Sequence, residues 1–406
     1  MANAIAPIDP VAIVAAANAD RRIDLRAAKF AKMAEGPFAF LRGGADLYFA
    51  RLDKTKHQDA PLGWMSGDLH LENFGVYRAA DGSTPFDIND FDQCALLPAS
   101  VEMVRFASSA IVAGDGKSIA RAAATKALIV YLETLANGDA NGWGVGSAGK
   151  LVKVFQADQQ GEDQTKWLKN RKEKAKDRRV FSASKSNRDI TARERAELKT
   201  AAKSLAAGRF DAKPEAWFEF RDAKFRATGL GSLGVRHYAI LVRGDGDPDA
   251  NCILDLKAAR AAVGSSLWTQ PAFANPAARV ATIQSACQAS PPHVGTVTMG
   301  GDDFVVRQAF AQDEKISIRE NIASWADFTD ALCDMARIAA CSHLRAAGQH
   351  GAAPAADFVR WAGKADVAAI IELAARAADD NDKDYAVFKA AAAAKDPRLF
   401  GGLPKP

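Results

Sequence analysis

Apolar residues recur along this chain with two different periods, and each period occupies its own stretch. In most of the chain, apolar side chains return every three or four residues, which is the spacing of a helix with one buried face. Proline or glycine bounds several of these segments, as Pro98 and Gly114 do for one of them. The pattern predicts helices over residues 21–34, 99–113, 117–137, 192–206, 276–288, 324–349, 355–378 and 380–395.

A different pattern begins near Trp217. Short runs of β-branched and aromatic residues follow one another there, and Gly, Asp and Pro interrupt them. The predicted strands lie around Phe225 and over residues 235–242, 252–256, 294–299 and 303–308. Closely spaced strands of this kind predict a small antiparallel sheet, so we expect the chain to belong to the α+β class.

The stretch Gly67–Asp92 carries the densest candidate chemistry. Asp68 stands five residues before Asn73, and the strand-turn-strand pattern that follows ends in Asp90-Phe91-Asp92. Phosphotransferases of the protein-kinase class place a catalytic Asp, an Asn and a second Asp in this order. In that chemistry Asp68 orients or deprotonates an acceptor hydroxyl, while Asn73 and Asp90 bind Mg²⁺, with Asp92 as a possible second acidic ligand. The alternative is a β-hairpin whose acidic residues cap turns.

A second motif lies in the strand-rich segment. Gly229, Gly231 and Gly234 form G-x-G-x-x-G between two predicted strands, and Lys257 ends the third strand. Glycine lets the backbone approach phosphates closely, Ser232 lies in the same loop, and a lysine neutralises phosphate charge. The glycines lead into a strand, so they are not a dinucleotide fingerprint, and no Gly-Lys-Ser/Thr follows, so they are not a Walker loop. The alternative is an ordinary hairpin turn.

Other side chains are candidates for supporting roles at the same site. Arg42 stands in Arg42-Gly43-Gly44, an expected turn, where it would clamp a phosphate or carboxylate or form a structural ion pair. Glu102 either braces the catalytic loop or is simply an acid favoured in the first turn of a helix. His343 lies near the end of the predicted helix 324–349, and we expect it to be a packed or capping residue.

The two motifs occur in an unexpected order. In kinase-like enzymes the Gly-rich loop and the Lys precede the catalytic loop, whereas here Asp68 comes first and Lys257 lies far downstream. Either the likeness is accidental or the chain is circularly permuted, which folds tolerate where natural ends lie close together. Permutation predicts that the helix at 324–349 packs beside residues 38–75.

Length and composition limit the class of protein. With 406 residues, of which 48% are hydrophobic and 25% charged, we expect an ordinary soluble chain of two lobes or domains. The net charge of +4 does not by itself imply nucleic acid. Five scattered cysteines without C-x-x-C spacing predict reduced, mostly buried thiols in the cytoplasm. We expect neither a secretory signal nor a membrane span.

Residues 166–188 are dense in Lys and Arg and contain few apolar positions. A surface for nucleic acid or an anionic substrate is one interpretation of this segment. A solvated helical insertion is the preferred one, because the interleaved aromatic residues of a single-strand platform are missing. We therefore expect neither nucleic acid nor a membrane as a partner.

Several segments together carry a resemblance to a known family. They are PFAFLRG (37–43), GDLHLENFG (67–75), DINDFD (87–92), GLGSLGVRHYAIL (229–241), LDLKAA (254–259), VRQ (306–308) and the helix near 336–346. In this order they resemble the bacterial domain of unknown function 2252 family, from about residue 20 to 395. His70 also resembles the GD-x-H form of aminoglycoside phosphotransferases. The resemblance implies a protein-kinase-like two-lobe fold, circularly permuted, with a small antiparallel-sheet nucleotide lobe and a large, mainly helical lobe.

One departure concerns the partner of Lys257. Kinases pair this lysine with a Glu on the following helix, but no Asp or Glu occurs between Lys257 and Asp302. Where the family has Arg-Val-Val-Glu, this chain has Arg279-Val280-Ala281-Thr282. We expect Gln284 or a carboxylate from elsewhere to hold Lys257, or the lysine to be held poorly.

These observations predict three segments with different structural roles. Residues 1–205 would form the first part of a helical lobe, 206–318 a β-rich nucleotide-binding lobe and 319–406 the second helical part. The expected function is phosphoryl transfer from ATP, with Mg²⁺, to a hydroxyl of an unknown and small acceptor. Transfer of AMP on the same fold and non-catalytic nucleotide binding by a scaffold are the alternatives.

Overall fold

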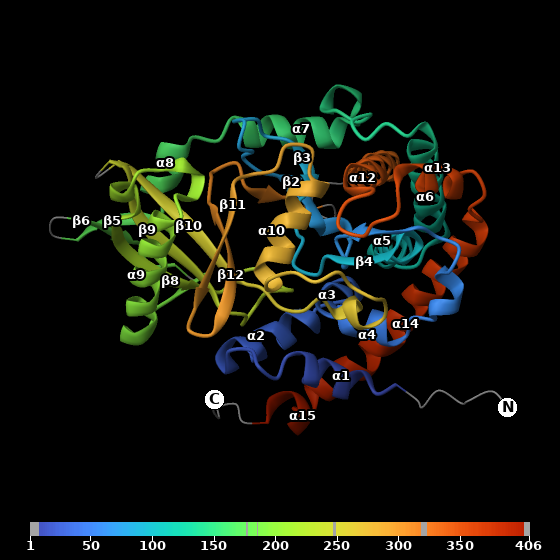
Figure 1. Ribbon diagram of the computed structural model, residues 1–406. Helices are drawn as coiled ribbons and strands as arrows, with labels where there is room; N and C mark the ends of the chain where they lie inside the picture. The colour runs from blue at the N-terminus through green and yellow to red at the C-terminus, as the bar shows by residue number, and fades with distance from the viewer. Residues whose placement is uncertain (1–7, 176–177, 185, 247–248, 318–322, 402–406) are drawn as a thin grey trace.

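The computed structural model describes residues 8–175, 178–184, 186–246, 249–317 and 323–401. An antiparallel sheet forms one part of the molecule and a group of helices the other, with α10 (Pro276–Cys287) between them (Figure 1). The expected α+β class is confirmed. All five cysteines are free and buried, as their spacing predicts.

The sheet has six strands in the order β11-β12-β10-β9-β8-β7, and each neighbouring pair is antiparallel. The strands are β7 (Asn187–Arg188), β8 (Phe220–Arg226), β9 (His237–Gly246), β10 (Ala250–Ala258), β11 (Val294–Met299) and β12 (Asp302–Gln308). On one face, α9 (Ala192–Ala207) packs through Leu198 and Leu205 against Phe225 and Leu254. The division expected after residue 205 therefore falls at the end of a helix that packs on this sheet.

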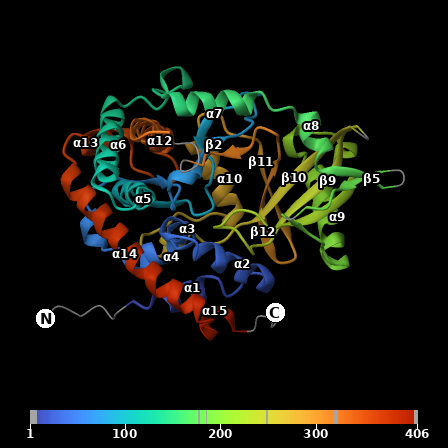
Figure 2. The ribbon, with the colours of Figure 1, turned by 180° about the vertical axis from the view of Figure 1, so that it is seen from behind.

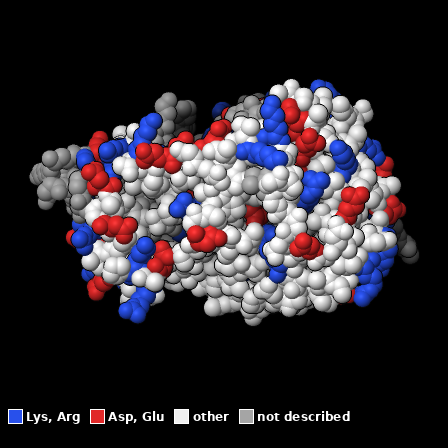
Figure 3. All heavy atoms as spheres, turned by 90° about the horizontal axis from the view of Figure 1, so that it is seen from above, with Lys and Arg blue, Asp and Glu red and all other residues white. Residues whose placement is uncertain are grey.

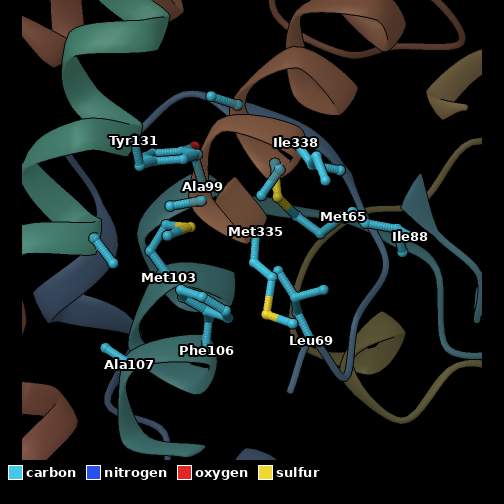
Figure 4. Packing of buried hydrophobic residues seen from close by; sticks show 14 of the residues in the cluster. Met65, Leu69, Ile88, Ala99, Met103, Phe106, Ala107, Tyr131, Met335 and Ile338 are labelled. Carbon is cyan, nitrogen blue, oxygen red and sulfur yellow. The ribbon is translucent and has the colours of Figure 1, made fainter. Parts of the chain in front are cut away.

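The helical part is built around a helix that is buried over almost its whole length. Every residue of α5 (Ala99–Ala113) from Ala99 to Val112 is buried. Helix α12 runs along α6, and α14 runs along α5. Figure 4 shows side chains of α5, α6 and α12 meeting in this core around Met103 and Met335. The surrounding helices are α6 (Ser118–Asn137), α7 (Lys150–Gln160), α12 (Trp325–Ala346), α13 (Ala355–Ala362) and α14 (Val367–Ala393).

The first helices of the chain and the last one lie together below the two parts (Figures 1 and 2). They are α1 (Pro10–Ala17), α2 (Ile23–Met33), α3 (Pro37–Gly43), α4 (Ala45–Ala50) and α15 (Pro397–Phe400). Helix α1 contacts α15, and Arg398 Nη1 lies 2.7 Å from Asp9 Oδ2. The turn expected at Arg42 is wrong, because Arg42 lies in the last turn of α3, which Pro37 opens.

Small strands and single turns connect these parts. Strand β1 (Leu62–Met65) pairs with β4 (Ala95–Pro98), and β2 (Phe74–Val76) pairs with both β3 (Phe86–Ile88) and β13 (Glu314–Lys315). The strand-turn-strand pattern expected after Asn73 is thus present as β2 and β3. The 3₁₀ turns are η1 (Lys54–His57), η2 (Leu71–Asn73), η3 (Val145–Ser147), η4 (Phe210–Ala212), η5 (Glu215–Phe218) and η6 (Val263–Ser266).

Two expectations about local structure are wrong. The basic segment was expected to be a helical insertion, but among its described residues only α8 (Gln164–Lys169) is helical, and β5 (Lys172–Ala175) pairs with β6 (Arg178–Phe181) in antiparallel register. Leu168 and Phe181 pack on the sheet and anchor this segment. The last helices were expected over 355–378 and 380–395, but the break lies earlier. Gly363 ends α13, and Asp366 caps α14 by accepting from Ala369 N.

Helix α12 lies beside the segment that permutation predicts. It contacts β1, and just beyond its end the carbonyl of Gln349 accepts a hydrogen bond from Trp64 Nε1 at 3.2 Å. Strand β1, just before Asp68, and the end of α12 are therefore neighbours in space, although they lie far apart in the chain.

Candidate functional site

A cavity of about 750 Å³ lies where the sheet meets the helical part. Most of the expected site residues line it, namely Arg42, Asp68, His70, Asn73, Asp90, Asp92, Gly229, Gly231, Ser232 and Lys257. Gly234 and Glu102 are not among the lining residues. The cavity is therefore formed by both motifs, which the fold brings together from distant parts of the chain.

The side chain of Glu102, which is fully buried, binds the loop that precedes Asp68. The Glu102 carboxylate accepts hydrogen bonds from Ser66 Oγ at 2.6 Å and from the backbone N–H of Gly67 at 2.9 Å. Its second oxygen lies 2.7 Å from Nε2 of His343. His343 is thus a packed residue, as expected. Glu102 contacts the loop, which is the arrangement expected if it braces the loop.

Gly67 occupies a position that only glycine fits. Its φ is +84°, and a Cβ there would lie 1.9 Å from the carbonyl oxygen of Gln93. After Asp68, the side chain of Leu69 turns down into the core beside Met335 (Figure 4). Gly67 and Leu69 therefore fix the backbone on both sides of Asp68.

The Asp68 carboxylate pairs with Arg105, which the sequence did not point to. Oδ1 accepts from Arg105 Nε at 3.0 Å and from Nη2 at 2.8 Å, and Nη2 also donates to the carbonyl of Leu41 at 2.7 Å. The Asn73 side chain donates to the backbone carbonyl of Asp68 at 2.7 Å. Burial raises the pKa of Asp68 to about 6, although Arg105 opposes that shift. A charged residue inside the apolar run of α5 was the available signal for Arg105.

Asp90 and Asp92 each pair with a lysine at the cavity. Asp90 Oδ2 lies 2.8 Å from Nζ of Lys315 on β13, and Asp92 pairs with Lys257. Burial alone would raise the pKa of Asp90, but Lys315 and Lys257 hold it below its usual range. Burial would likewise lower the pKa of Lys257, but Asp92 and Asp90 raise it.

Lys257 is therefore held by an acid that comes from elsewhere in the chain. That acid is Asp92, which forms an ion pair with Lys257. Of the alternatives expected from the sequence, a carboxylate from elsewhere is the one present, whereas the Gln284 amide donates to Oε1 of Gln288, the residue after α10, at 3.0 Å. Asp92 thus pairs with the lysine, whereas the sequence suggested it as a possible magnesium ligand.

The oxygen donors at the cavity fit a magnesium ion that takes most of its ligands from a bound substrate. Among the described residues, no group of three or more His, Cys, Asp and Glu side chains converges as a metal site. Mg²⁺ commonly uses one or two protein oxygens together with phosphates and waters. Asn73 donates through its side-chain nitrogen, which leaves its side-chain oxygen as a potential ligand, and Asn73 and Asp90 line the same cavity. Lys315 would have to release Asp90 for such an ion.

The Gly-rich loop joins β8 to β9 above the helix α2. Gly229 and Gly234 have φ values of +73° and +87°, in the left-handed region that favours glycine. Arg22 donates its backbone N–H to the Gly234 carbonyl at 2.9 Å. Contacts with α2 therefore fix the path of this loop, and Gly234 lies at its base.

The two remaining candidates, Arg42 and His70, contact the same glutamate. Arg42 Nη1 lies 2.6 Å from Glu72 Oε2, so Arg42 forms a structural ion pair. His70 Nδ1 accepts from the backbone N–H of Glu72 at 3.2 Å. Burial, with the nearby Arg42 charge, lowers the pKa of His70 well below its usual range, so the ring is neutral.

A buried polar cluster on the sheet forms another wall of the cavity, and sequence reasoning missed it. Asp255 accepts from Arg226 Nη1 at 2.5 Å and lies 2.8 Å from Nε2 of His237. Asp255 and Lys257 share one face of β10 because side chains alternate along a strand. The spacing Leu-Asp-Leu-Lys was therefore a signal that two charged groups face the same side.

Part of the basic segment also reaches the cavity. Lys166, Trp167, Asn170 and Arg171 line it, and the Arg171 guanidinium lies 4.1 Å from the centre of the Trp167 ring. On the described part of the face seen in Figure 3, basic and acidic side chains are interspersed. Absence of a nucleic-acid partner stays a prediction.

Comparisons with known proteins identify a family and nothing finer. No helix in the described part of the chain is both long enough and apolar enough to cross a bilayer. Neither the curated proteins nor the solved structures contain a match to this chain. One family model matches residues 21–139 and 144–391, and its description is "Uncharacterized protein conserved in bacteria (DUF2252)". The match covers most of the chain, and the chain therefore belongs to this uncharacterised bacterial family.

Proposed function

We propose that this protein is an ATP- and Mg²⁺-dependent phosphotransferase with a circularly permuted, kinase-like fold, acting on a hydroxyl of a small acceptor. The observation that carries the proposal is the convergence of Asp68, Asn73 and Asp90 with the Gly-rich loop and Lys257 on one cavity. The two sets come from segments far apart in the chain. Two unrelated local turns would give no reason for both sets to meet at one cavity.

The sheet supports the nucleotide side of the proposal. The Gly-rich loop joins the strands β8 and β9, and Lys257 lies on β10, directly opposite His237 of β9. Protein kinases likewise cover the phosphates with a Gly-rich loop and place the phosphate-binding lysine on the third strand. The Lys257–Asp92 pair keeps the lysine charged and oriented without a helix glutamate.

The loop supports the acceptor side. Asp68 is fixed by Arg105 and by the loop geometry around Gly67, so it would meet an acceptor hydroxyl without reorganisation. In this proposal Asp68 accepts or orients the hydroxyl proton, and Asn73 and Asp90 hold the ion. Magnesium, when bound, would neutralise the developing charge on the transferred phosphoryl group. Lys257 and the Gly-rich loop position the triphosphate.

Thermal unfolding with and without ATP and Mg²⁺ tests the nucleotide site. A ligand that binds only the folded protein raises Tm. At a ligand concentration one hundred times Kd, the free energy of unfolding increases by about 2.7 kcal/mol. We expect a Mg²⁺-dependent rise in wild type and in Asp379→Ala, an exposed change on α14. The rise should be lost in Asp90→Ala. Asp68→Asn should keep the rise but lose turnover of ATP with acceptors by about a hundredfold or more.

The products separate this proposal from its competitors. Phosphoryl transfer releases ADP, whereas transfer of AMP releases pyrophosphate. Tight ATP binding with no turnover over a wide acceptor panel would indicate a nucleotide-binding scaffold. No rise in Tm of wild type at several millimolar ATP would refute the nucleotide site.

A further inference from the structure

Two basic side chains on the cavity wall below the Gly-rich loop have no carboxylate partner. Lys29 of α2 and Arg21 just before it both line the cavity. Among the described residues, neither lies within ion-pair distance of an acidic group. Their polar contacts are with the Gly-rich loop: Lys29 Nζ lies 3.4 Å from the carbonyl oxygen of Gly231, and Arg21 Nη1 donates to that of Leu233 at 2.8 Å.

Lys29 is the more informative of the two because it is only 2% exposed. A buried ammonium without a counter-ion is unfavourable, since burial removes its hydration. Burial accordingly lowers the pKa of Lys29 well below its usual range, and lowers that of Arg21 to about 10. The Nε of Arg21 is also buried without a hydrogen-bond partner. An apolar residue at position 29 would pack in the same place at less cost.

The acids nearest to this pair do not satisfy it. Asp46 and Asp68 act on Lys29 at a distance, but Asp68 is engaged by Arg105. Two other cations at the cavity are neutralised, since Lys257 pairs with Asp92 and Lys315 with Asp90. The amine of Lys29 and the charge of Arg21 are therefore left for a molecule that enters the cavity, and an anion there would favour the charged form of Lys29.

We propose that Lys29 and Arg21 bind an anionic group, a phosphate or a carboxylate, of a molecule held in the cavity. Lys29 contacts the Gly-rich loop at Gly231, and both side chains line the same cavity as Asp68. An acceptor whose hydroxyl reaches Asp68 therefore shares that cavity with this pair. The acceptor is then a hydroxyl compound that itself carries a phosphate or carboxylate group. This assignment to the acceptor rests on the proposed function, whereas anion binding by Lys29 and Arg21 does not.

Calorimetric titration with inorganic phosphate and pyrophosphate, without nucleotide and at constant ionic strength, tests the anion site. Lys29→Met removes the charge and keeps the length of the side chain, and Lys32→Met on the exposed face of α2 is the matched control. We expect Lys29→Met and Arg21→Gln each to weaken anion binding about tenfold or more, because a charged hydrogen bond is lost. Lys32→Met should bind as wild type does.

Lys29→Met also has an expected signature without any ligand. Because it removes an unpaired buried charge, its Tm should equal or exceed that of wild type. A large fall in Tm together with unchanged anion affinity would show that Lys29 is a structural residue. Wild type that binds neither anion at millimolar concentration, or equal affinities in wild type and both variants, would also overturn the site.

Saturating nucleotide then identifies which molecule supplies the anion. If phosphate still binds in the presence of ATP and Mg²⁺, the anionic group belongs to the acceptor. If ATP blocks phosphate binding and ADP does not, Lys29 and Arg21 hold the terminal phosphate of the donor, and the acceptor assignment is wrong. Phosphate binding without any rise in Tm from ATP would refute the proposed function and leave the anion site standing.

Discussion

Asp68 is positioned by its neighbours more than by its own contacts. Gly67 allows the chain to pass within van der Waals distance of Gln93, and the Asn73 side chain closes the loop on the Asp68 carbonyl. Arg105 then orients the carboxylate from the helix below. At this scale the site is a short backbone segment with a fixed shape, and the acid projects from it.

Replacement of Gly67 should reveal how tightly that segment is packed. Gly67→Ala places a methyl group against a backbone carbonyl at a positive φ, so we expect a loss of about 3 kcal/mol or more in the free energy of unfolding. Gly116→Ala is the matched control, because Gly116 has a φ of +69° and nothing within 4 Å of its Cβ position. It should lose only about 1 kcal/mol. Denaturant unfolding of both proteins measures the difference, and equal losses would refute the packing argument.

The spacing of residues in the sequence identified some members of the site and missed those that reach it from other segments of the chain. Asp68, Asn73 and Asp90 stood out because their separations match a known order. Arg105, Lys29 and Asp255 belong to regular elements, and their spacing marks only the face they occupy. Whether that face borders a cavity depends on what packs against it, which is a property of the folded chain.

At the scale of elements, the loop that carries Asp68 is held by a buried network of three helices, one of which lies far away in the chain. Glu102 of α5 holds the loop, His343 of α12 contacts Glu102, and Tyr131 of α6 lies 2.8 Å from the other ring nitrogen of His343. The network is buried throughout. Its members therefore have no water to replace a lost partner, and the elements depend on one another.

Removal of Glu102 should loosen the loop and the helix pair together. Glu102→Ala leaves Ser66, Gly67 and His343 with buried groups that have lost a partner, so we expect a loss of about 3 kcal/mol or more in stability. Glu133→Ala, an exposed change on α6, should stay within about 0.5 kcal/mol of wild type. Thermal and denaturant unfolding give both values. A Glu102 variant as stable as the control would mean that the network contributes nothing to folding.

Errors at this scale came from composition. The Lys-rich run was expected to be helical, yet Leu168 and Phe181 dock on the sheet and the chain between them forms a hairpin. The alanine-rich end hid the break between α13 and α14, since alanine favours a helix everywhere and marks no boundary. The hydrophobic pattern predicted most helices and strands. Where one residue type dominates a segment, it predicted their boundaries poorly.

For the molecule as a whole, the chain order and the spatial order differ. The Asp68 loop comes first in the chain, and the sheet with the Gly-rich loop follows, but α12 contacts β1, just before the Asp68 loop. The ends of the described chain lie side by side, since Asp9 and Arg398 form an ion pair. A circularly permuted kinase-like fold requires both the contact between α12 and β1 and the proximity of the two chain ends.

A rearranged gene tests whether the order of segments matters. Joining the present ends with a short linker and opening the exposed turn between Asn141 and Gly142 places the sheet before the catalytic loop. We expect this chain to unfold cooperatively with a loss of about 2 kcal/mol or less, because only loop closure changes. Circular dichroism and thermal unfolding measure it. Opening the chain instead inside α5, which is buried throughout, should abolish folding. Failure of the first permutant alone would show that segment order is essential.

The sequence by itself determined the kinds of elements, the α+β class and the motif residues, because local periodicity and short-range spacing carry that information. It also supported the family to which the chain belongs. Only the tertiary structure decided that both motifs border one cavity, that Asp92 holds Lys257 and that Lys29 is buried with no acid of the described residues within ion-pair distance. These are contacts between segments far apart in the chain, and their free energy depends on burial and charge in the folded state, which no local pattern encodes.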